Sequence, residues 1–161
     1  MQFRVGVGYD VHQLKEGETF TLGGIVIPHS KGAVGHSDAD VLIHTICDAL
    51  LGAANLGDIG THFPDTDAAY KGIDSKILLK NVGQLLTKKG YKIGNIDSTV
   101  CLQQPKLKPH IPKMKSTIAE TLGVNIEQVS VKATTTEKLG FVGREEGVSA
   151  YAVCLIEQVT L

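Results

Sequence analysis

The sequence predicts a single domain, residues 1–161, of the α/β class and of α+β type, in which a small mixed sheet is packed by helices on one side. The length is that of one ordinary domain, and 42% hydrophobic and 20% charged residues are typical of a globular protein with a buried core. Segments with strand and helix patterns follow in the order β, ββ, α, α, β, α, β, β. Because strands and helices do not alternate strictly, this order does not indicate a doubly wound sheet.

The amino-terminal part of the chain predicts strands. Residues 3–11, FRVGVGYDV, are apolar and spaced by glycine, which indicates a buried strand. Residues 19–30, TFTLGGIVIPHS, predict a hairpin with Gly23 and Gly24 at its turn.

Three later segments predict helices. Residues 38–54 carry apolar residues at helical spacing, residues 75–89 end at Gly90, and residues 112–122 begin with a proline. The apolar stripe of the first helix consists of Leu42, Ile46, Ala49, Leu50 and Ala53.

The remaining segments predict one long loop and three strands. Residues 55–74 hold three glycines and a proline without periodicity, and a loop of this length in a compact chain is usually functional or mobile. Residues 91–103, 129–136 and 148–159 are rich in β-formers, and residues 137–147 join the last two.

Composition narrows the class of protein. A formal net charge of −1 offers no basic surface to nucleic acid, so a nucleic-acid partner is not expected. The chain has no apolar run of about 18 residues and no signal-peptide pattern after Met1, so no membrane association is expected. Cys47, Cys101 and Cys154 lie in apolar runs without C-x-x-C spacing, which predicts free thiols and a cytoplasmic location.

An acid and an imidazole stand together in the first predicted strand. Asp10 and His12 are two residues apart and therefore share one face of the strand, about 7 Å from each other. Such a pair is expected to form a mutual hydrogen bond, to lie at a solvent-exposed strand end, or to bind a metal. The pair alone does not decide between these alternatives.

The first predicted helix offers a partner. Asp40, His44 and Asp48 are four residues apart and form one polar stripe, which in a generic amphipathic helix is a solvated face. As a third ligand beside Asp10 and His12, His44 would complete one carboxylate and two imidazoles, the pattern of a catalytic zinc site with an open position. Asp48 would then accept the second ring N–H of His44.

Other polar segments suit a phosphate. His36 and Ser37 precede the expected helix start, where free N–H groups and the helix dipole favour an anion by about 0.3–1 kcal/mol. The alternative is that Ser37 or Asp38 only caps the helix. Thr134–Thr136 followed by Glu137 suit a phosphate and a hard cation, although threonines at a strand end are usually plain β-formers.

The long loop and the other histidines have simpler alternatives. Asp58, Asp65 and Asp67 either bind a ligand or form Asx turns. The remaining histidines have no partner at a suitable spacing and are interpreted as surface or packing residues; they are His29, His62 and His110.

Four motifs resemble one enzyme family in order and spacing. They are GYDVHQL (8–14), GHSDADVLIHTICDALLGAANLGDIGTHFPDTD (35–67), PKLKPHI (105–111) and VKATTTEKLGFVGREEG (131–147). Together they resemble the 2-C-methyl-D-erythritol 2,4-cyclodiphosphate synthases over nearly the whole chain. The departures are Ala39, where glycine is frequent, and Gln104, where a small residue is common, and neither falls on a ligand position.

The resemblance implies roles for individual residues. Asp10, His12 and His44 match ligands of Zn²⁺ or another divalent transition metal, and Glu137 matches a ligand of Mg²⁺ or Mn²⁺ bound with the diphosphate. His36 and Thr135 match catalytic positions that stabilise the transition state. The implied substrate-binding positions are Asp10, Val11, His12, His36, Ser37, Asp58, Ile59, Gly60, Phe63, Pro64, Asp65, Thr66, Asp67, Leu102, Gln103, Gln104, Pro105, Lys106, Leu107, Lys108, Thr134, Thr135, Thr136, Glu137, Phe141 and Arg144.

The resemblance also implies an assembly and a reaction. The family forms homotrimers with active sites between subunits. Its small-molecule substrate is 4-diphosphocytidyl-2-C-methyl-D-erythritol 2-phosphate, which a lyase of the non-mevalonate isoprenoid pathway cyclises with release of CMP. A zinc-dependent nucleotide phosphodiesterase is the main alternative, because it would use the same three ligands to activate water. A non-enzymatic nucleotide-binding module is a third possibility, but it would have no use for the metal ligands.

Overall fold

The computed structural model describes residues 2–159 and contains one mixed sheet of five strands. Its strands are β1 (Phe3–Glu16), β4 (Lys31–Val34), β5 (Tyr91–Cys101), β6 (Val129–Thr134) and β7 (Gly147–Gln158). They lie side by side in the order β4-β1-β7-β5-β6. The β5–β6 pair is parallel and the other neighbouring pairs are antiparallel, so the prediction of a mixed sheet is confirmed.

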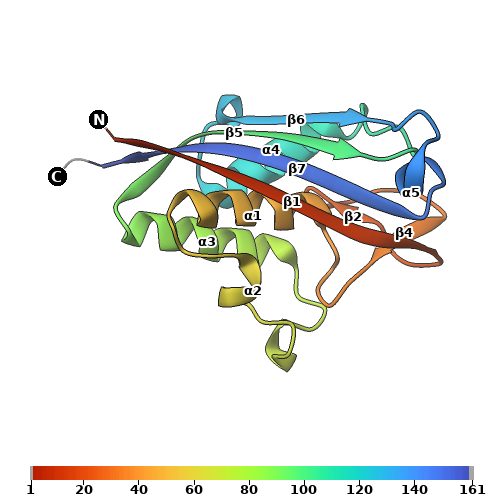
Figure 1. Cartoon of the computed structure of the whole chain (residues 1–161), viewed down its shortest axis with the longest axis horizontal. Coiled ribbons are helices and arrows are strands. Elements are labelled where there is room, and N and C mark those ends of the chain that lie inside the picture. Colours follow the sequence, from red (N-terminus) through yellow and green to blue (C-terminus); the bar gives the residue numbers. More distant parts are fainter. Residues whose placement is uncertain (1, 160–161) are drawn as a thin grey trace.

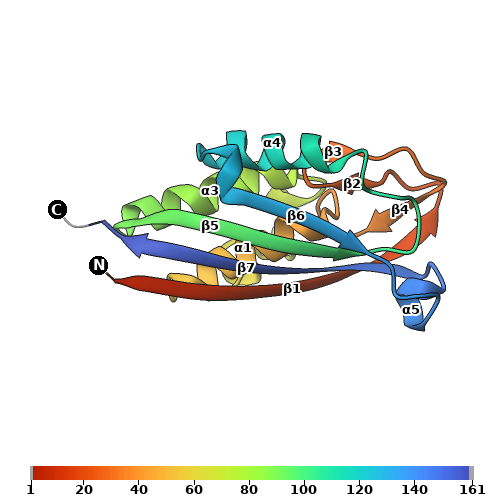
Figure 2. The same ribbon diagram turned by 90° about the horizontal axis from the view of Figure 1, so that it is seen from above.

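Three helices cover the sheet on one side only. They are α1 (Val41–Ala53), α3 (Ser75–Lys88) and α4 (Ile111–Leu122). Figures 1 and 2 show all three behind the same face, with α1 lying against β1 and β7. The predicted fold class and the second and third predicted helices are therefore confirmed. Within residues 2–159, the structure has no helix with both the length and the apolar character of a membrane span.

Short elements occupy the connections between these strands and helices. They are β2 (Thr21–Leu22), β3 (Ile25–Val26), α2 (Ile59–His62), η1 (Ala68–Tyr70), η2 (Ile126–Gln128) and α5 (Gly140–Gly143). The pair β2–β3 is the predicted hairpin, with positive φ angles at Gly23 and Gly24 in its turn. The absence of structure predicted for residues 55–74 is wrong in part, because α2 and η1 lie in this segment.

The first strand is longer than its pattern indicated. β1 continues from Val11 to Glu16 because its last residues pair with β4, a strand that was not predicted. β4 has only four residues, and one of them is Gly32, whose missing side chain leaves room for the backbone of Glu18 and Thr19. A strand this short and interrupted by glycine has no recognisable period.

The first helix begins later than expected. Asp40 is its N-cap and accepts a hydrogen bond from Ile43 N at 3.0 Å, so a helix start at Asp38 and a cap by Ser37 or Asp38 are wrong. The cause is Ala39, whose φ of 57° belongs to the left-handed region and cannot occur inside a right-handed helix.

Two glycines bring α1 into direct contact with β1. A Cβ at Gly6 would overlap the carbonyl oxygen of Ala49, and a Cβ at Gly8 would overlap that of Thr45. Both glycines lie on the face of β1 that also carries Asp10 and His12, because alternate residues of a strand share a face. The glycine spacing therefore sets how close a side chain of α1 can come to these two residues.

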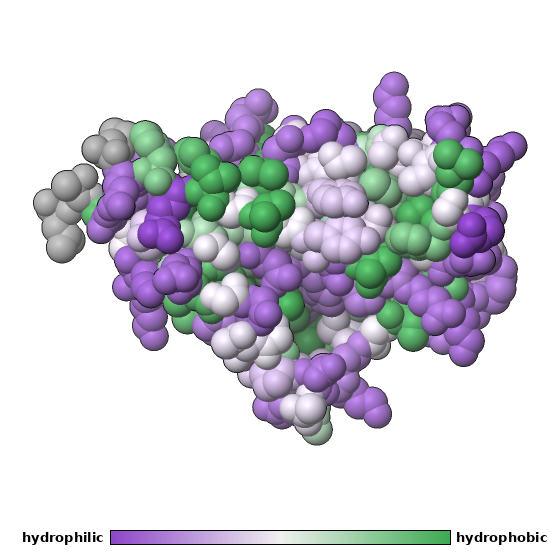
Figure 3. All heavy atoms as spheres, in the orientation of Figure 1, coloured by the Kyte–Doolittle hydropathy of each residue, from purple (hydrophilic) through white to green (hydrophobic). Residues whose placement is uncertain are grey.

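The other face of the sheet is not covered in the protomer. Odd-numbered residues of β1 point to this side and are exposed, with Val7 71% exposed, and Tyr151 and Val153 of β7 are exposed beside them. The apolar and tyrosine side chains of this open face are Phe3, Val5, Val7, Tyr9, Val11, Tyr151 and Val153. Figure 3 shows green hydrophobic side chains and pale side chains of intermediate hydropathy over these two strands. A contiguous apolar patch on a sheet face is typical of an interaction surface.

Candidate metal centre and substrate pocket

Asp10 and His12 of β1 meet His44 of α1 at the junction of the sheet and the helix. Asp10 Oδ2 lies 3.0 Å from His12 Nε2 and 3.3 Å from His44 Nδ1. The two imidazole nitrogens are 3.2 Å apart. A tetrahedral site with bonds of about 2.0–2.1 Å separates its ligand atoms by roughly 3.3 Å. The three residues, called the metal trio below, therefore fit one small divalent cation.

A backbone carbonyl of β4 orients the ring of His12. Its Nδ1 lies 3.0 Å from the carbonyl oxygen of Val34 in β4, to which it donates. A backbone carbonyl accepts only, so Nδ1 carries a hydrogen, and Nε2 is the nitrogen left to face Asp10, His44 and a cation. The strand that the sequence did not reveal thus holds one of the ligands in its metal-binding form.

The ring of His44 is oriented differently from the expectation. Its Nε2 faces two hydroxyls, Ser75 Oγ at 2.9 Å and Ser37 Oγ at 3.0 Å. Asp48 does not hold this ring, so that prediction is wrong: its Oδ1 accepts from Ile59 N at 2.8 Å. Helix spacing places Asp48 one turn beyond His44, but its carboxylate turns toward the start of α2.

The electrostatics of the trio keep its carboxylate ionised. Burial would raise the pKa of Asp10, but hydrogen bonds and charge from His12 and His44 outweigh it and hold that pKa well below its usual range. Burial would lower the pKa of His12, but the hydrogen bond and charge of Asp10 outweigh it and raise that pKa. An ionised carboxylate is the form in which aspartate binds a cation.

A pocket of about 360 Å³ opens beside the trio, and it is called the site pocket below. Predicted residues line much of it, namely His12, His36, Ser37, His44, Ile59, Gly60, Phe63 and Asp65. Tyr70, Ile73 and Leu78 also line it and were not predicted. They follow the predicted loop in the chain, but nothing in their residue types distinguishes them from packing residues.

The start of α1 does not offer the anion site that was expected. The buried carboxylate of Asp40 accepts from Gly23 N at 2.9 Å and Gly24 N at 2.7 Å, as well as from Ile43 N at 3.0 Å. A helix N-terminus already occupied by a carboxylate does not attract a phosphate. His36 and Ser37 still reach the site pocket, but as side chains on the loop before the helix.

Two aspartates of the long loop shape the loop itself. Asp58 caps α2 by accepting from Thr61 N at 2.9 Å, and Asp67 caps η1 by accepting from Ala69 N at 2.9 Å. The Asx-turn interpretation therefore describes both of them. The carbonyl oxygen of Asp67 lies 3.4 Å from His36 Nε2, which connects the loop to the pocket wall.

A second group of predicted residues gathers where β5 and β6 end. Leu102 N donates to Thr134 O at 2.9 Å, and Lys138 N donates to Gln103 Oε1 at 3.2 Å, which links residues 102–108 to residues 134–138. Thr135 Oγ1 lies 3.3 Å from Glu137 Oε1, and both side chains are exposed. The side chains of Leu102 and Leu107 are buried in the core, so only their backbone can face a ligand.

The protomer does not bring the two groups into one pocket. Asp10 pairs with Ala150, Ala150 with Val100, and Val100 with Ala133, so three strand spacings of about 4.8 Å separate β1 from β6 there. The distance across the sheet is therefore about 14 Å. No residue of the second group lines the site pocket.

The remaining predicted positions lie at the edge of the site or in the core. Arg144, just after α5, pairs with Glu146 at 3.0 Å and is exposed together with Phe141. His62 Nε2 lies 2.8 Å from Leu56 O, in agreement with a packing role. The three cysteines are free thiols, as predicted, and burial raises the pKa of Cys154 to about 11.

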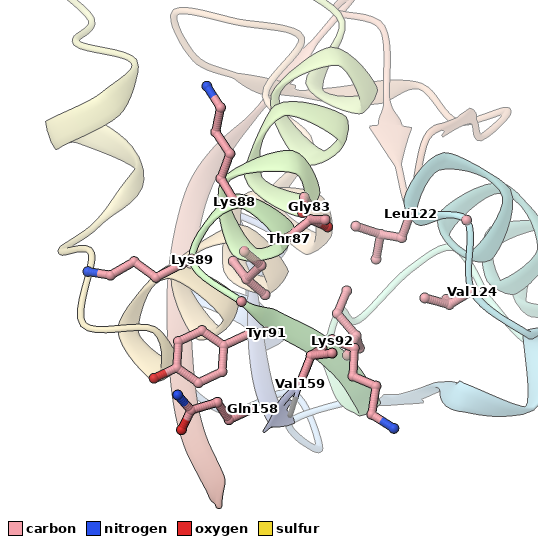
Figure 4. Close-up of a pocket in the computed structure, with 14 residues that line it drawn as sticks. Gly83, Thr87, Lys88, Lys89, Tyr91, Lys92, Leu122, Val124, Gln158 and Val159 are labelled. Atoms are coloured by element: carbon pink, nitrogen blue, oxygen red, sulfur yellow. Dashed lines mark hydrogen bonds between the residues drawn. The ribbon is translucent and has the colours of Figure 1, made fainter. Parts of the chain in front are cut away.

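A larger cavity of about 720 Å³ lies at the opposite end of the sheet, and it is called the far cavity. Figure 4 shows it between the ends of α3 and α4, the start of β5 and the end of β7. Its polar residues include Lys88, Lys89 and Lys92, and its other walls include Leu122 and Val124. None of the predicted site residues lines it.

Comparison with known proteins assigns the chain to a family. The model of the YgbB family matches residues 3–157. A 2-C-methyl-D-erythritol 2,4-cyclodiphosphate synthase of Bacteroides thetaiotaomicron is 65% identical over 158 residues, covering 98% of this chain and 99% of that one. A synthase of the same name from Parabacteroides distasonis is 62% identical over 159 residues, covering 99% of each chain.

Solved structures agree in fold. The bifunctional IspDF of Campylobacter jejuni superposes with a TM-score of 0.94 at 43% identity, covering 98% of this chain and 42% of that longer one. IspF of Plasmodium falciparum, in a complex with CDP, superposes with a TM-score of 0.86 at 37% identity, covering 98% of this chain and 97% of that one.

Proposed function

The chain belongs to the YgbB family, and on that premise we propose that it converts 4-diphosphocytidyl-2-C-methyl-D-erythritol 2-phosphate into 2-C-methyl-D-erythritol 2,4-cyclodiphosphate and CMP. It is a phosphorus–oxygen lyase of the non-mevalonate isoprenoid pathway. The observation that carries the proposal is the convergence of Asp10, His12 and His44 beside the site pocket, in a chain 65% identical to a synthase of this reaction.

The reaction joins two ends of one substrate molecule. An oxygen of the 2-phosphate bonds to the β-phosphorus of the diphosphate, and the bond from that phosphorus to the bridging oxygen breaks, so its electron pair leaves with CMP. Because the attacking phosphate is already an anion near neutral pH, the chain needs no serine or cysteine nucleophile and no dedicated base. Its task is to align the two groups, which can contribute about 7–11 kcal/mol, and to neutralise their charge.

The metal trio provides the centre of this charge neutralisation. A divalent cation, which we propose to be Zn²⁺ or another transition metal, would supply positive charge to the β-phosphate when bound. The chain holds the three ligand atoms 3.0–3.3 Å apart with the carboxylate ionised, so little rearrangement is needed to bind it. Glu137 is the proposed ligand of Mg²⁺ or Mn²⁺ at the diphosphate, beside Thr134–Thr136.

The other residues bind and orient the substrate. His36 and Ser37 present an imidazole and a hydroxyl to the site pocket, where the 2-phosphate and β-phosphate would lie. Thr135 presents its hydroxyl to the same phosphates from the end of β6, and Lys106 and Lys138 add positive charge. Residues 58–67 contact the methylerythritol part from the loop around α2.

The nucleotide lies at the second group of residues. Residues 102–108 form the proposed cytosine and ribose pocket, which reads the base largely through backbone groups, since two of its leucine side chains belong to the core. The related structure from Plasmodium falciparum is a complex with CDP, which supports a cytidine nucleotide as ligand.

We propose a homotrimer with the active sites between subunits. The open face of the sheet presents apolar side chains that a neighbouring subunit would cover. The metal trio and the end of β6 are about 14 Å apart across one sheet, so a neighbour is a natural source of the missing wall. We place Phe141 and Arg144, both exposed, at this proposed boundary. With three free thiols, the proposed location is the cytoplasm.

Product analysis tests the function. The purified protein is incubated with the cytidyl substrate, Mg²⁺ and Zn²⁺, and the product is identified by phosphorus NMR. We expect the cyclic diphosphate and CMP. A linear product of water attack would instead identify a phosphodiesterase, the alternative that the relatives do not favour. Binding of CDP without any turnover would identify a nucleotide-binding module.

A further inference from the structure

The hydroxyl of Ser75 lies between a metal ligand and a carboxylate. Ser75 is the first residue of α3 and is fully buried. Its Oγ is 2.9 Å from His44 Nε2 and 2.5 Å from Asp38 Oδ1. Asp38 is fixed in turn, because its Oδ2 accepts from Ser75 N at 3.0 Å and its Oδ1 accepts from Asp40 N at 3.2 Å. These contacts form a chain from Asp38 through Ser75 to the metal trio.

The direction of these hydrogen bonds follows from what each group can do. An ionised carboxylate only accepts, so the single hydroxyl hydrogen of Ser75 points to Asp38. Toward His44 the serine oxygen then presents lone pairs and can only accept. At 2.9 Å, an Nε2 without hydrogen would set two lone pairs against each other, so Nε2 carries the hydrogen. With the hydrogen held on Nε2, Nδ1 is the nitrogen whose lone pair a cation can take, and Nδ1 is the atom that faces Asp10 and His12.

The second hydroxyl at this ring is in a different position. Ser37 Oγ is 3.0 Å from His44 Nε2 and accepts from Ala39 N at 3.2 Å, but no carboxylate fixes its hydrogen. Ser37 also lines the site pocket, whereas Ser75 is sealed behind the ring. If Ser75 fixes the tautomer of His44, the hydroxyl hydrogen of Ser37 is left to point into the pocket, where a phosphate oxygen would accept it.

We propose that Ser75 and Asp38 are positioning residues for the metal centre, which hold His44 in the tautomer that presents Nδ1 to the cation and leave the Ser37 hydroxyl to the substrate. The inference rests on the metal site of the proposed function. Neither residue touches the cation or the substrate. Groups that orient a metal-binding histidine typically contribute 10–100-fold to metal affinity.

Zinc binding tests the inference without using turnover. The metal-free protein is titrated with Zn²⁺ alone against a competing chelator, for the parent, Ser75→Ala and Asp38→Asn. We expect both variants to bind Zn²⁺ 10–100-fold more weakly. Ser98→Ala is the matched control, because Ser98 is also a buried serine and donates to Ser130 O on β6, away from the trio. Its zinc affinity should equal that of the parent.

Ser37→Ala separates the two hydroxyls. We expect it to change zinc affinity only a few-fold and to raise KM more than Ser75→Ala does. Ser75→Ala should retain the fold, because alanine favours a helix and the backbone N–H of residue 75 still donates to Asp38. If it does not fold, imidazole ¹⁵N spectra of the parent still decide the question, since they report which nitrogen of His44 carries the hydrogen.

Three results would overturn the inference. They are parent-like zinc affinity of folded Ser75→Ala, a loss of affinity confined to Ser37→Ala, and a metal-free parent in which Nε2 of His44 carries no hydrogen. A parent that makes the cyclic product while Ser75→Ala binds zinc normally would refute this inference alone. A parent that binds no zinc and makes no cyclic product would refute the proposed function as well.

Discussion

The site pocket and the far cavity lie at opposite ends of the same sheet and differ in what lines them. The site pocket, about 360 Å³, is bordered by three histidines, a serine and an aspartate, and the carboxylate of Asp10 lies beside them. The far cavity is twice as large, about 720 Å³, and its walls are helix ends, lysines and aliphatic side chains. Volume therefore does not identify the site, whereas converging acid, imidazole and hydroxyl groups do.

The other predicted site residues do not close over the site pocket in the protomer. The end of β6 lies about 14 Å away across the sheet, and residues 102–108, which follow β5, do not line the pocket. A pocket that is open on one side in the protomer is what a site completed by a second subunit would look like.

The largest difference in turnover is expected between one substitution at the metal trio and one in the far cavity. His44→Ala removes one of three ligands and should lower turnover at least 1,000-fold while the chain stays folded. Lys89→Ala in the far cavity should leave turnover within about twofold of the parent, since surface substitutions rarely affect more than local contacts. Turnover is measured by CMP release and bound zinc by elemental analysis. Stoichiometric zinc and normal turnover in His44→Ala would refute the metal assignment.

Mixing two inactive variants tests whether the site pocket is completed by a neighbour. His44→Ala damages the metal half and Thr135→Ala the nucleotide half. If these halves come from different subunits, co-refolding equal amounts should restore both halves in about a quarter of the sites, by random assembly of a symmetric oligomer. The activity of the mixture should rise far above that of either single variant. No rescue, with mixed trimers demonstrated by native mass spectrometry, would show that each subunit builds its own site.

Two glycine substitutions compare the packing at the two ends. Gly8→Ala forces a Cβ into the carbonyl oxygen of Thr45 and should cost about 2–3 kcal/mol or more, because backbone must move. The displaced α1 would carry His44 away from Asp10, so zinc affinity should fall too. Gly83 borders the far cavity, and the Cβ added by Gly83→Ala would meet only the end of the Leu122 side chain. The free energy of unfolding should therefore change by no more than about 1 kcal/mol. Urea unfolding measures both, and equal effects would contradict this account of the helix contact.

The smallest effect concerns pH in the metal-free protein. The pKa of His12 is raised in the folded chain, so its contribution to stability is complete below its ordinary value of 6.5 and is lost as pH rises through the folded value. The pKa of Asp10 is lowered, so its contribution is present above 3.8 and is lost only in stronger acid. The free energy of unfolding should therefore fall as the pH rises above about 6.5.

The controls for this pH effect again use both ends of the molecule. Lys89→Ala should keep the pH dependence of the parent, whereas His12→Ala should flatten it. With zinc bound the trend should reverse, because imidazoles bind a cation only when neutral. Urea midpoints at several pH values, with and without chelator, measure these slopes. A metal-free stability that rises from pH 6 to pH 8 would contradict the direction given for His12.

The sequence predicted the metal trio because its geometry is mostly local. Asp10 and His12 share a strand face by the two-residue period, and the helical stripe placed His44 toward a polar partner. The resemblance of the motifs then linked the two segments. Two of the three main helices were likewise predictable from the helical period and from the glycine and proline at their ends, which differ by about one residue from those observed.

The surroundings of the trio could not be predicted, because they depend on contacts between distant segments. Ser75 reaches His44 only because α3 packs beside α1, and no residue spacing in the sequence predicts that packing. The carbonyl of Val34 that holds His12 belongs to a strand too short to have a period. Asp48 was misassigned because helix spacing gives the direction of a side chain but not the partner that competes for it.

The contact between β1 and α1 has a consequence for protein engineering. To transplant this metal centre into another scaffold, a designer would need more than three ligand residues at matching coordinates. The donor strand must also bring Gly6 and Gly8, because any side chain at these positions would meet the backbone of the helix that carries the third ligand. The smallest portable unit is therefore a strand that alternates glycine, glycine, aspartate and histidine on one face, together with the helix that lies on it. Grafts that copy the ligands onto a strand with ordinary side chains should hold the helix too far away to bind metal.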